Sequence, residues 1–165
     1  WPLQGRSGNG KLVMWRQLIL GIALVCGATG QAPAYDLSQH EWRHRLLFLV
    51  APEAENADLK MRQREVAIRP EAVLDRDILV FQLLSDQGAL GGTGLSAEAV
   101  RDLRAQLGVA ADDRLLILIG KDGGIKRRAG LDTDLREIFL QIDAMPMRRE
   151  EMRTKSEAGV PVTLP

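Results

Sequence analysis

The stretch LLILIGKDGGIKRRA, residues 115–129, decides the fold. Its first five residues, 115–119, are all apolar, which is typical of a strand that is buried on both faces. The DGG of residues 122–124 is a hairpin signal, because glycine tolerates positive φ. Residues 125–129 are then expected to return as a second strand, and their basic side chains suit an exposed sheet edge. The stretch therefore predicts an antiparallel hairpin at one edge of a sheet.

Two more apolar runs upstream predict further buried strands. Residues 46–51 (LLFLVA) are stopped by Pro52, and residues 78–84 (ILVFQLL) form the second run. The glycine-rich residues 88–94 are expected to form a flexible loop. This loop does not end in Gly-Lys-Ser/Thr, so nothing in it supports a phosphate-binding loop.

Helical segments separate these strands. Residues 56–69 are charged and contain no proline, which predicts a helix. Ser96 is a suitable cap for the next helix, and Gly108 ends it. The last long helix is expected to begin near Asp132 or Thr133, because apolar residues then recur at helical spacing.

The resulting element order is β-α-β-α-β-β-α. Alternating strands and helices predict parallel strands joined by right-handed crossovers, and the final hairpin predicts an antiparallel edge. The fold class is therefore α/β with a mixed sheet, in the minimal thioredoxin-like arrangement. Met145-Pro146-Met147 is expected to end or kink the last helix, and residues 148–155 to form a further short helix.

The N-terminal residues 1–34 have the pattern of upstream sequence followed by a secretory signal peptide. Met14 is the better start, and it is followed by Arg16, an apolar run over residues 18–28 and small residues up to Ala34. The apolar run is too short for a bilayer, which needs about 20 residues. We expect cleavage after Ala34, export to the periplasm or the exterior, and no membrane association afterwards.

Removal of this segment leaves a single domain over residues 35–155 and a loose tail over residues 156–165. The only cysteine, Cys26, lies in the segment that is removed. Because the thiolate is the reacting group of thiol–disulfide exchange, we expect no such activity. The whole chain has 22 basic and 22 acidic residues, and only 4% of its residues are aromatic, so a nucleic-acid-binding role is not expected.

Four stretches of the chain are distinctive: Trp42 with residues 45–47 (RLL), Arg76-Asp77, residues 118–126 (LIGKDGGIK) and residues 142–153 (IDAMPMRREEMR). These stretches resemble domain of unknown function 4174, a thioredoxin-like, peroxiredoxin-related family also called P-DUDES. The resemblance spans about residues 36–153 and implies a thioredoxin-like fold and an exported location, but no established activity. A thioredoxin carries its cysteines after the first strand and a proline before the third, whereas residues 52–56 (PEAEN) and 112–114 (DDR) stand at those places.

His40-Glu41-Trp42-Arg43-His44 matches the H-E-x-x-H pattern of zinc hydrolases. In such enzymes the two histidines bind zinc from one helix, the glutamate activates water, and a third ligand completes the site. Glu65 is the acidic candidate for that third ligand. The alternative interpretation is a partly exposed lead-in of one helical turn, over residues 36–42, in which Trp42 packs on the core.

Two other segments are candidates for binding. Glycines and basic residues in residues 120–126 suit a small anion, although a well-formed hairpin with a charged edge is favoured, because turn chemistry alone explains the glycines. The methionines and arginines from Met145 onward suit a protein partner, or else the methionines pack on the core and the arginines pair with Glu150 and Glu151. Alanine at positions 148 and 149 is expected to weaken partner binding with little effect on melting. The candidate binding residues are Lys121, Asp122, Lys126, Met147, Arg148, Arg149 and Arg153.

The sequence thus favours an exported, non-catalytic module that binds a protein or a small anionic ligand and needs no cofactor. The alternatives are a small zinc hydrolase that uses His40, Glu41 and His44, and an inert domain without a ligand site.

Overall fold

A computed structural model describes residues 35–163, and the strands of this part of the chain form one mixed sheet in the order β4–β3–β2–β1–β5–β6. The strands are β1 (Arg45–Val50), β2 (Ile78–Leu83), β3 (Gly88–Leu90), β4 (Thr93–Gly94), β5 (Leu115–Ile119) and β6 (Ile125–Gly130). The helices are the short 3-10 helix η1 (Leu37–His40), α1 (Ala57–Ile68), α2 (Pro70–Asp75), α3 (Ala97–Leu107), α4 (Leu135–Asp143) and α5 (Pro146–Glu157).

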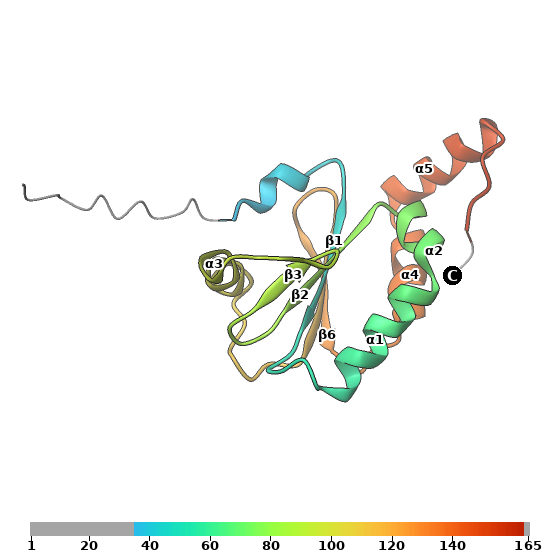
Figure 1. Cartoon of the computed structure of the whole chain (residues 1–165). Coiled ribbons are helices and arrows are strands. Elements are labelled where there is room, and N and C mark those ends of the chain that lie inside the picture. The colour runs from blue at the N-terminus through green and yellow to red at the C-terminus, as the bar shows by residue number, and fades with distance from the viewer. Residues whose placement is uncertain (1–34, 164–165) are drawn as a thin grey trace, which may run out of the picture. The chain divides into compact units, whose positions relative to one another are not determined.

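Strand β1 lies at the centre of the sheet and is buried on both faces, as its uninterrupted apolar run predicts. Leu47 and Leu49 point into the core beneath α1, α2 and α4. Phe48 and its alternate neighbours point to the opposite core, where α3 packs. Figure 1 shows this layering, with α3 on one side of the sheet and α1, α2 and α4 on the other.

Local capping signals place the helix ends, and most of the predicted bounds are confirmed. The Asn56 side chain accepts a hydrogen bond from the N–H of Leu59 at the start of α1, and Ser96 caps α3 in the same way. Gly108 ends α3 with φ of 60°, a conformation that glycine adopts without strain. Helix α4 begins slightly later than predicted, because the Asp134 side chain provides its cap.

The strand order β2–β1–β5–β6, with β1 and β2 parallel and the β5–β6 hairpin antiparallel, is the thioredoxin-like arrangement that the element order predicts. The expectation of a parallel third strand is wrong, since β5 runs antiparallel to β1. Helix α3 does not return the chain to the edge where β1 begins. The Ser85 hydroxyl instead donates to the carbonyls of Pro52 and Ala111, so the loop before β5 is tied to the edge where β1 and β2 end.

The expectation of a flexible loop over residues 88–94 is also wrong. These residues form the β3–β4 hairpin, which extends the sheet beyond β2. Its turn consists of Gly91 and Gly92, with φ of 55° and 89°. Two residues with positive φ are what a tight hairpin turn requires, so this Gly-Gly pair was a turn signal.

The predicted signal peptide, its cleavage after Ala34 and Cys26 lie outside the described residues. Among the residues that the structure does describe, no helix is long and apolar enough to cross a membrane. At the other end of the chain, the segment after α5 comes back to α2: the N–H of Thr163 donates to Asp75, and its carbonyl accepts from Arg76.

Candidate functional site

The candidate site lies at the edge of the sheet where β1 and β2 begin. Arg45 is the first residue of β1, Arg76 and Asp77 immediately precede β2, and Lys121 follows β5. Because β1 and β2 are parallel and β5 is antiparallel to β1, these three chain segments meet at one edge. Helix α5 covers them and contributes Arg148 and Glu151.

Arg148 is at the centre of this arrangement and is completely buried. Its guanidinium donates to the carbonyl of Asp75 at 2.7 Å and to the Asp75 carboxylate, and its Nε lies 3.2 Å from the Asp143 carboxylate. An arginine in this position cannot contact a partner from outside. This burial contradicts the expectation that Arg148 is a docking residue, and we expect its replacement to lower the melting temperature.

Two more arginines are buried beside Arg148. Arg76 lies 2.5 Å from the Asp143 carboxylate and places its guanidinium carbon 4.7 Å from the centre of the Phe139 ring. Arg45 donates twice to the Glu151 carboxylate, at 3.1 Å each, and also donates to the backbone carbonyl of Arg76. Buried arginines need such partners, because an unpaired charge in the interior is strongly destabilising.

Lysines complete the set, which we call the charge cluster. Lys121 is almost buried and lies 2.7 Å from the Asp77 carboxylate and 2.8 Å from that of Glu151. Lys155 lies 2.7 Å from the Asp75 carboxylate. The charge cluster comprises Arg45, Arg76, Arg148, Lys121 and Lys155 with Asp75, Asp77, Asp143 and Glu151.

Two carboxylates of the charge cluster, Glu151 and Asp75, are held in their ionised form. Burial raises the pKa of Glu151, but hydrogen bonds from Arg45 and Lys121 outweigh it, so the pKa lies below its ordinary value of 4.5. Burial likewise raises the pKa of Asp75, and hydrogen bonds from Lys155 and Arg148 bring it below 3.8. Both groups therefore stay charged at neutral pH and are poor proton donors or acceptors there.

A cavity of about 360 Å³ opens beside the charge cluster and joins the two segments that the sequence singled out for binding. Lys121, Asp122 and Lys126 line it from the β5–β6 turn, and Met147 lines it from the first turn of α5. The Asp122 and Lys126 side chains form an ion pair of 2.6 Å at the partly exposed rim. The remaining lining residues are Arg45, Gly120, Met145 and Pro146.

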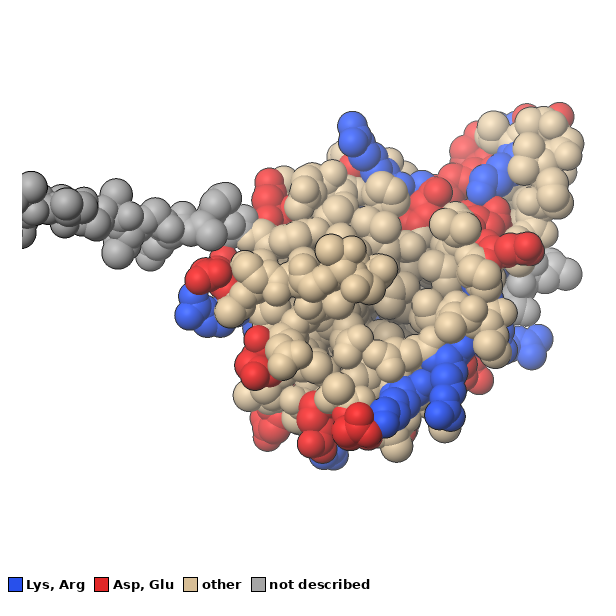
Figure 2. Space-filling model, viewed as in Figure 1, with Lys and Arg blue, Asp and Glu red and all other residues tan. Residues whose placement is uncertain are grey.

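The other predicted binding residues do not line this cavity. Arg149 and Arg153 are exposed on α5, and Arg153 pairs with Glu150 and Glu157. Figure 2 shows the resulting mixture of basic and acidic side chains over α5, toward the upper right. The pairing of Arg153 with Glu150 agrees with the alternative in which the arginines pair with neighbouring glutamates, whereas the 41% exposure of Met147 does not agree with methionines packed on the core.

The sequence matches a known protein family over most of the described residues. Residues 36–151 match the model described as "Domain of unknown function (DUF4174)". The chain belongs to the DUF4174 family. This result confirms the resemblance seen in the sequence, and each of the stretches that carried it contributes a residue to the charge cluster or to its cavity.

Two individual proteins are similar to this DUF4174 chain. Coiled-coil domain-containing protein 80 of Danio rerio is 28% identical over an alignment of 143 residues, and the match covers 75% of this chain and 16% of that protein. The chain thus spans about a sixth of the length of this relative. The mitochondrial 2-Cys peroxiredoxin from Plasmodium falciparum is 14% identical, with a TM-score of 0.48 over 78% of this chain and 87% of that one.

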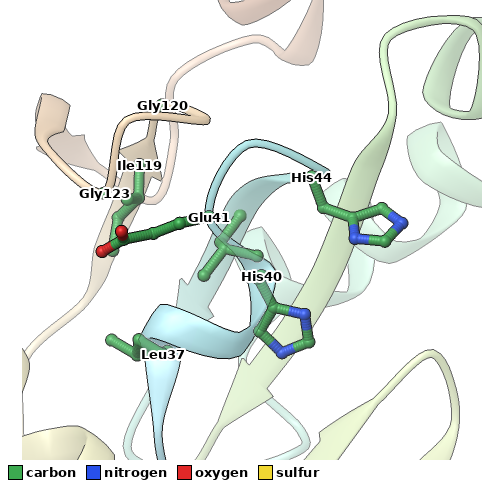
Figure 3. A pocket seen from close by; sticks show the side chains of 8 residues that line it. Leu37, His40, Glu41, His44, Ile119, Gly120 and Gly123 are labelled. Atoms are coloured by element: carbon green, nitrogen blue, oxygen red, sulfur yellow. The ribbon is translucent and has the colours of Figure 1, made fainter.

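The H-E-x-x-H segment of the DUF4174 domain does not have the geometry of a zinc-binding helix. Helix η1 is a 3-10 helix that ends at His40, and Trp42 follows with φ of 63°. Figure 3 shows Glu41 pointing toward Gly123, away from the two histidine rings. The predicted third ligand, Glu65, instead pairs with Arg62 of α1. Within residues 35–163 no group of three His, Cys, Asp or Glu side chains is arranged to hold a metal ion.

The two histidines instead line a small recess of about 40 Å³ in the DUF4174 domain. The Nε2 of His40 lies 3.0 Å from the Tyr35 hydroxyl, and the two imidazole rings are 6.0 Å apart. Burial lowers the pKa of His40, and the neighbouring His44 lowers it further. Trp42 is 68% exposed rather than packed on the core, and its backbone N–H donates to the Lys121 carbonyl.

The place that holds the reactive cysteines of a thioredoxin is at the opposite edge of the sheet, in the loop after β1. Here residues 52–56 contain no cysteine, and the carbonyl of Pro52 is used by Ser85. The charge cluster lies where β1 begins, at the other end of the same strand. The candidate site therefore does not reuse the location of the parent fold's chemistry.

Proposed function

We propose that this DUF4174 domain is a non-catalytic binding module. It holds an anionic ligand in the cavity between the β5–β6 turn and the first turn of α5. The observation that carries the proposal is the convergence of two segments, separated by about twenty residues of chain, on one cavity of about 360 Å³. This volume is in the range of small-molecule sites.

The chemistry of the cavity favours binding over catalysis. The carboxylates in and behind its lining are paired with cations, and the pKa of Asp122 is lowered by the hydrogen bond from Lys126. A general acid or base works best with a pKa near the working pH, which these groups lack. The sequence over residues 35–165 also offers no thiolate.

We also propose that the domain acts outside the cytoplasm. The support is the leader pattern of residues 14–34, with a basic residue, a short apolar run and small residues before Ala34. The test is expression of the chain in a bacterium followed by fractionation and N-terminal sequencing. A mature terminus at Tyr35 in the exported fraction supports the proposal, and an uncleaved cytoplasmic chain contradicts it.

The binding proposal is tested by recording ¹H–¹⁵N spectra of the labelled chain with a set of small anions and neutral compounds. The expected result is that at least one anion shifts the signals of residues 120–126 and 145–147. Met147→Trp should remove those shifts by filling the cavity, whereas the exposed Arg149→Gln should retain them. Shifts confined to His40 and His44, or no shifts at the cavity with any compound, contradict the proposal.

A further inference from the structure

Basic side chains outnumber carboxylates around the cavity. The charge cluster and the Asp122–Lys126 pair at the rim together contain six cationic side chains and five carboxylates, and Asp75 is shared by Arg148 and Lys155. Glu41 lies against Gly123 and lines the histidine recess instead. This excess of positive charge favours an anionic ligand in the cavity.

Arg45 lines the cavity and has a buried donor without a hydrogen-bond partner among the described residues. Its side chain is only 1% exposed, and this donor is its Nε. Lys126 also retains donor capacity, since an ammonium group has three N–H donors and, within residues 35–163, Asp122 is its one hydrogen-bond partner. A buried donor without a partner is unfavourable, and the Arg45 guanidinium adds positive charge to the lining of the cavity.

The first turn of α5 adds positive potential at the same place. The helix begins at Pro146, its cap residue Met145 provides no side-chain hydrogen bond, and its first turn holds no acidic residue. The N-terminal N–H groups of a helix carry a partial positive charge that an anion can neutralise. Met145, Pro146 and Met147 all line the cavity, so this helix end faces the same space as Lys121 and Lys126.

The rest of the lining is apolar and adaptable. The three residues Met145, Pro146 and Met147 form one wall, and Met147 is 41% exposed although it is a large apolar side chain. Methionine side chains are flexible and polarisable, and they adjust to ligands of different shape. A bare inorganic anion would leave this wall in contact with water, whereas an apolar chain on the anion would cover it.

We propose, on the basis of the binding function above, that the cavity takes a carboxylate joined to an apolar chain. The carboxylate lies near Lys126 and the first turn of α5, and the chain lies along Met145 and Met147. This chemistry has two sources, a free aliphatic acid and the C-terminal carboxylate of a peptide that ends in an apolar residue.

The proposal is tested by calorimetric titration of the purified chain with octanoate, acetate and 1-octanol, with octanoate below its micelle concentration. Octanoate is expected to bind at least about tenfold more tightly than acetate, because its additional methylene groups are buried along Met145 and Met147. It is also expected to bind more tightly than 1-octanol, which lacks the charge. Equal affinity for octanoate and either comparison compound overturns the proposal.

Two variants of lining residues, with Arg149→Gln as the control, test where the ligand binds. Lys126→Gln is expected to weaken octanoate about fivefold, as for loss of a partly exposed ion pair, and Arg149→Gln removes a charge from α5 without an effect. Met147→Gln keeps the length of the side chain but makes it polar, and it should reduce the preference for octanoate over acetate. Equal octanoate affinity in Lys126→Gln and Arg149→Gln contradicts the placement of the carboxylate.

The source is identified by a short peptide that ends in leucine, used with a free or an amidated C-terminus. Displacement of octanoate by the free acid alone identifies a chain terminus as the ligand, and failure of both peptides identifies a free aliphatic acid. If other anions shift the cavity signals but octanoate does not, this inference fails and the binding function stands. If no compound shifts those signals, both fail.

Discussion

Replacement of Arg148 by methionine should be strongly destabilising, although the residue is in a charged helix close to the C-terminus. Its guanidinium is fully buried and pairs with both Asp75 and Asp143. The Nη1 atom of the same guanidinium also lies 3.7 Å from the Glu151 carboxylate. Methionine fills similar volume and suits a helix, so the loss is one of charge pairing rather than packing. Removal of one partner from a buried ion pair usually costs about 3–5 kcal/mol.

The lower end of that range applies here because the abandoned carboxylates retain other partners. Asp75 keeps Lys155 and the N–H of Thr163, and Asp143 keeps Arg76. We therefore expect a loss of about 3 kcal/mol in the free energy of unfolding, or a fall in Tm of about 10 °C for a domain of this size.

The assay is urea denaturation followed by circular dichroism, with Arg149→Met as the matched control. Arg149 is the next residue on α5 but is exposed, so its replacement should change stability by no more than about 0.5 kcal/mol. If the two variants unfold at the same urea concentration, Arg148 does not hold the charge cluster together and the reasoning is refuted.

Three further results are expected. The wild type should be more stable than Glu151→Gln at neutral pH, and this difference should shrink as the pH falls below 4.5, because a carboxyl with a lowered pKa stabilises the fold only while it is ionised. Free energies of unfolding measured between about pH 7 and pH 3 check this, and a difference that does not change with pH contradicts it. Gly108→Ala should lower the free energy of unfolding by about 1 kcal/mol because φ is 60°, whereas Gly94→Ala, at ordinary φ in open space, should be nearly neutral. Equal melting temperatures of the two variants would contradict the argument from φ. After equilibration with excess zinc and desalting, the chain should hold far less than about one zinc per molecule, and any residual zinc should be unaffected by His44→Ala. One zinc per chain in the wild type that is lost in His44→Ala would restore the hydrolase interpretation.

Local patterns in the sequence were sufficient for most of the secondary structure. Apolar runs predicted β1, β2 and β5, and the capping residue Ser96 predicted where α3 begins. These signals act within a few residues, so no tertiary information is needed to recognise them. The direction of β5 was missed because an apolar run has no polarity and the direction depends on which sheet edge the preceding loop is tied to.

The site could be predicted in part. The hairpin and the methionine segment were both identified, but their convergence on one cavity depends on contacts across the sheet and α5. Arg148 looked like a surface residue, because charge on a helix usually is solvated. Its partners Asp75 and Asp143 lie elsewhere in the chain, and only folding brings them together.

The account depends most on the position of the bound ligand, which a crystal structure of the chain soaked with octanoate would reveal directly. The account predicts density for the carboxylate near Lys126 and the first turn of α5, with the alkyl chain along Met147. Density in the recess at His40 and His44, or in the loop of residues 52–56 after β1, with an empty cavity, would contradict it.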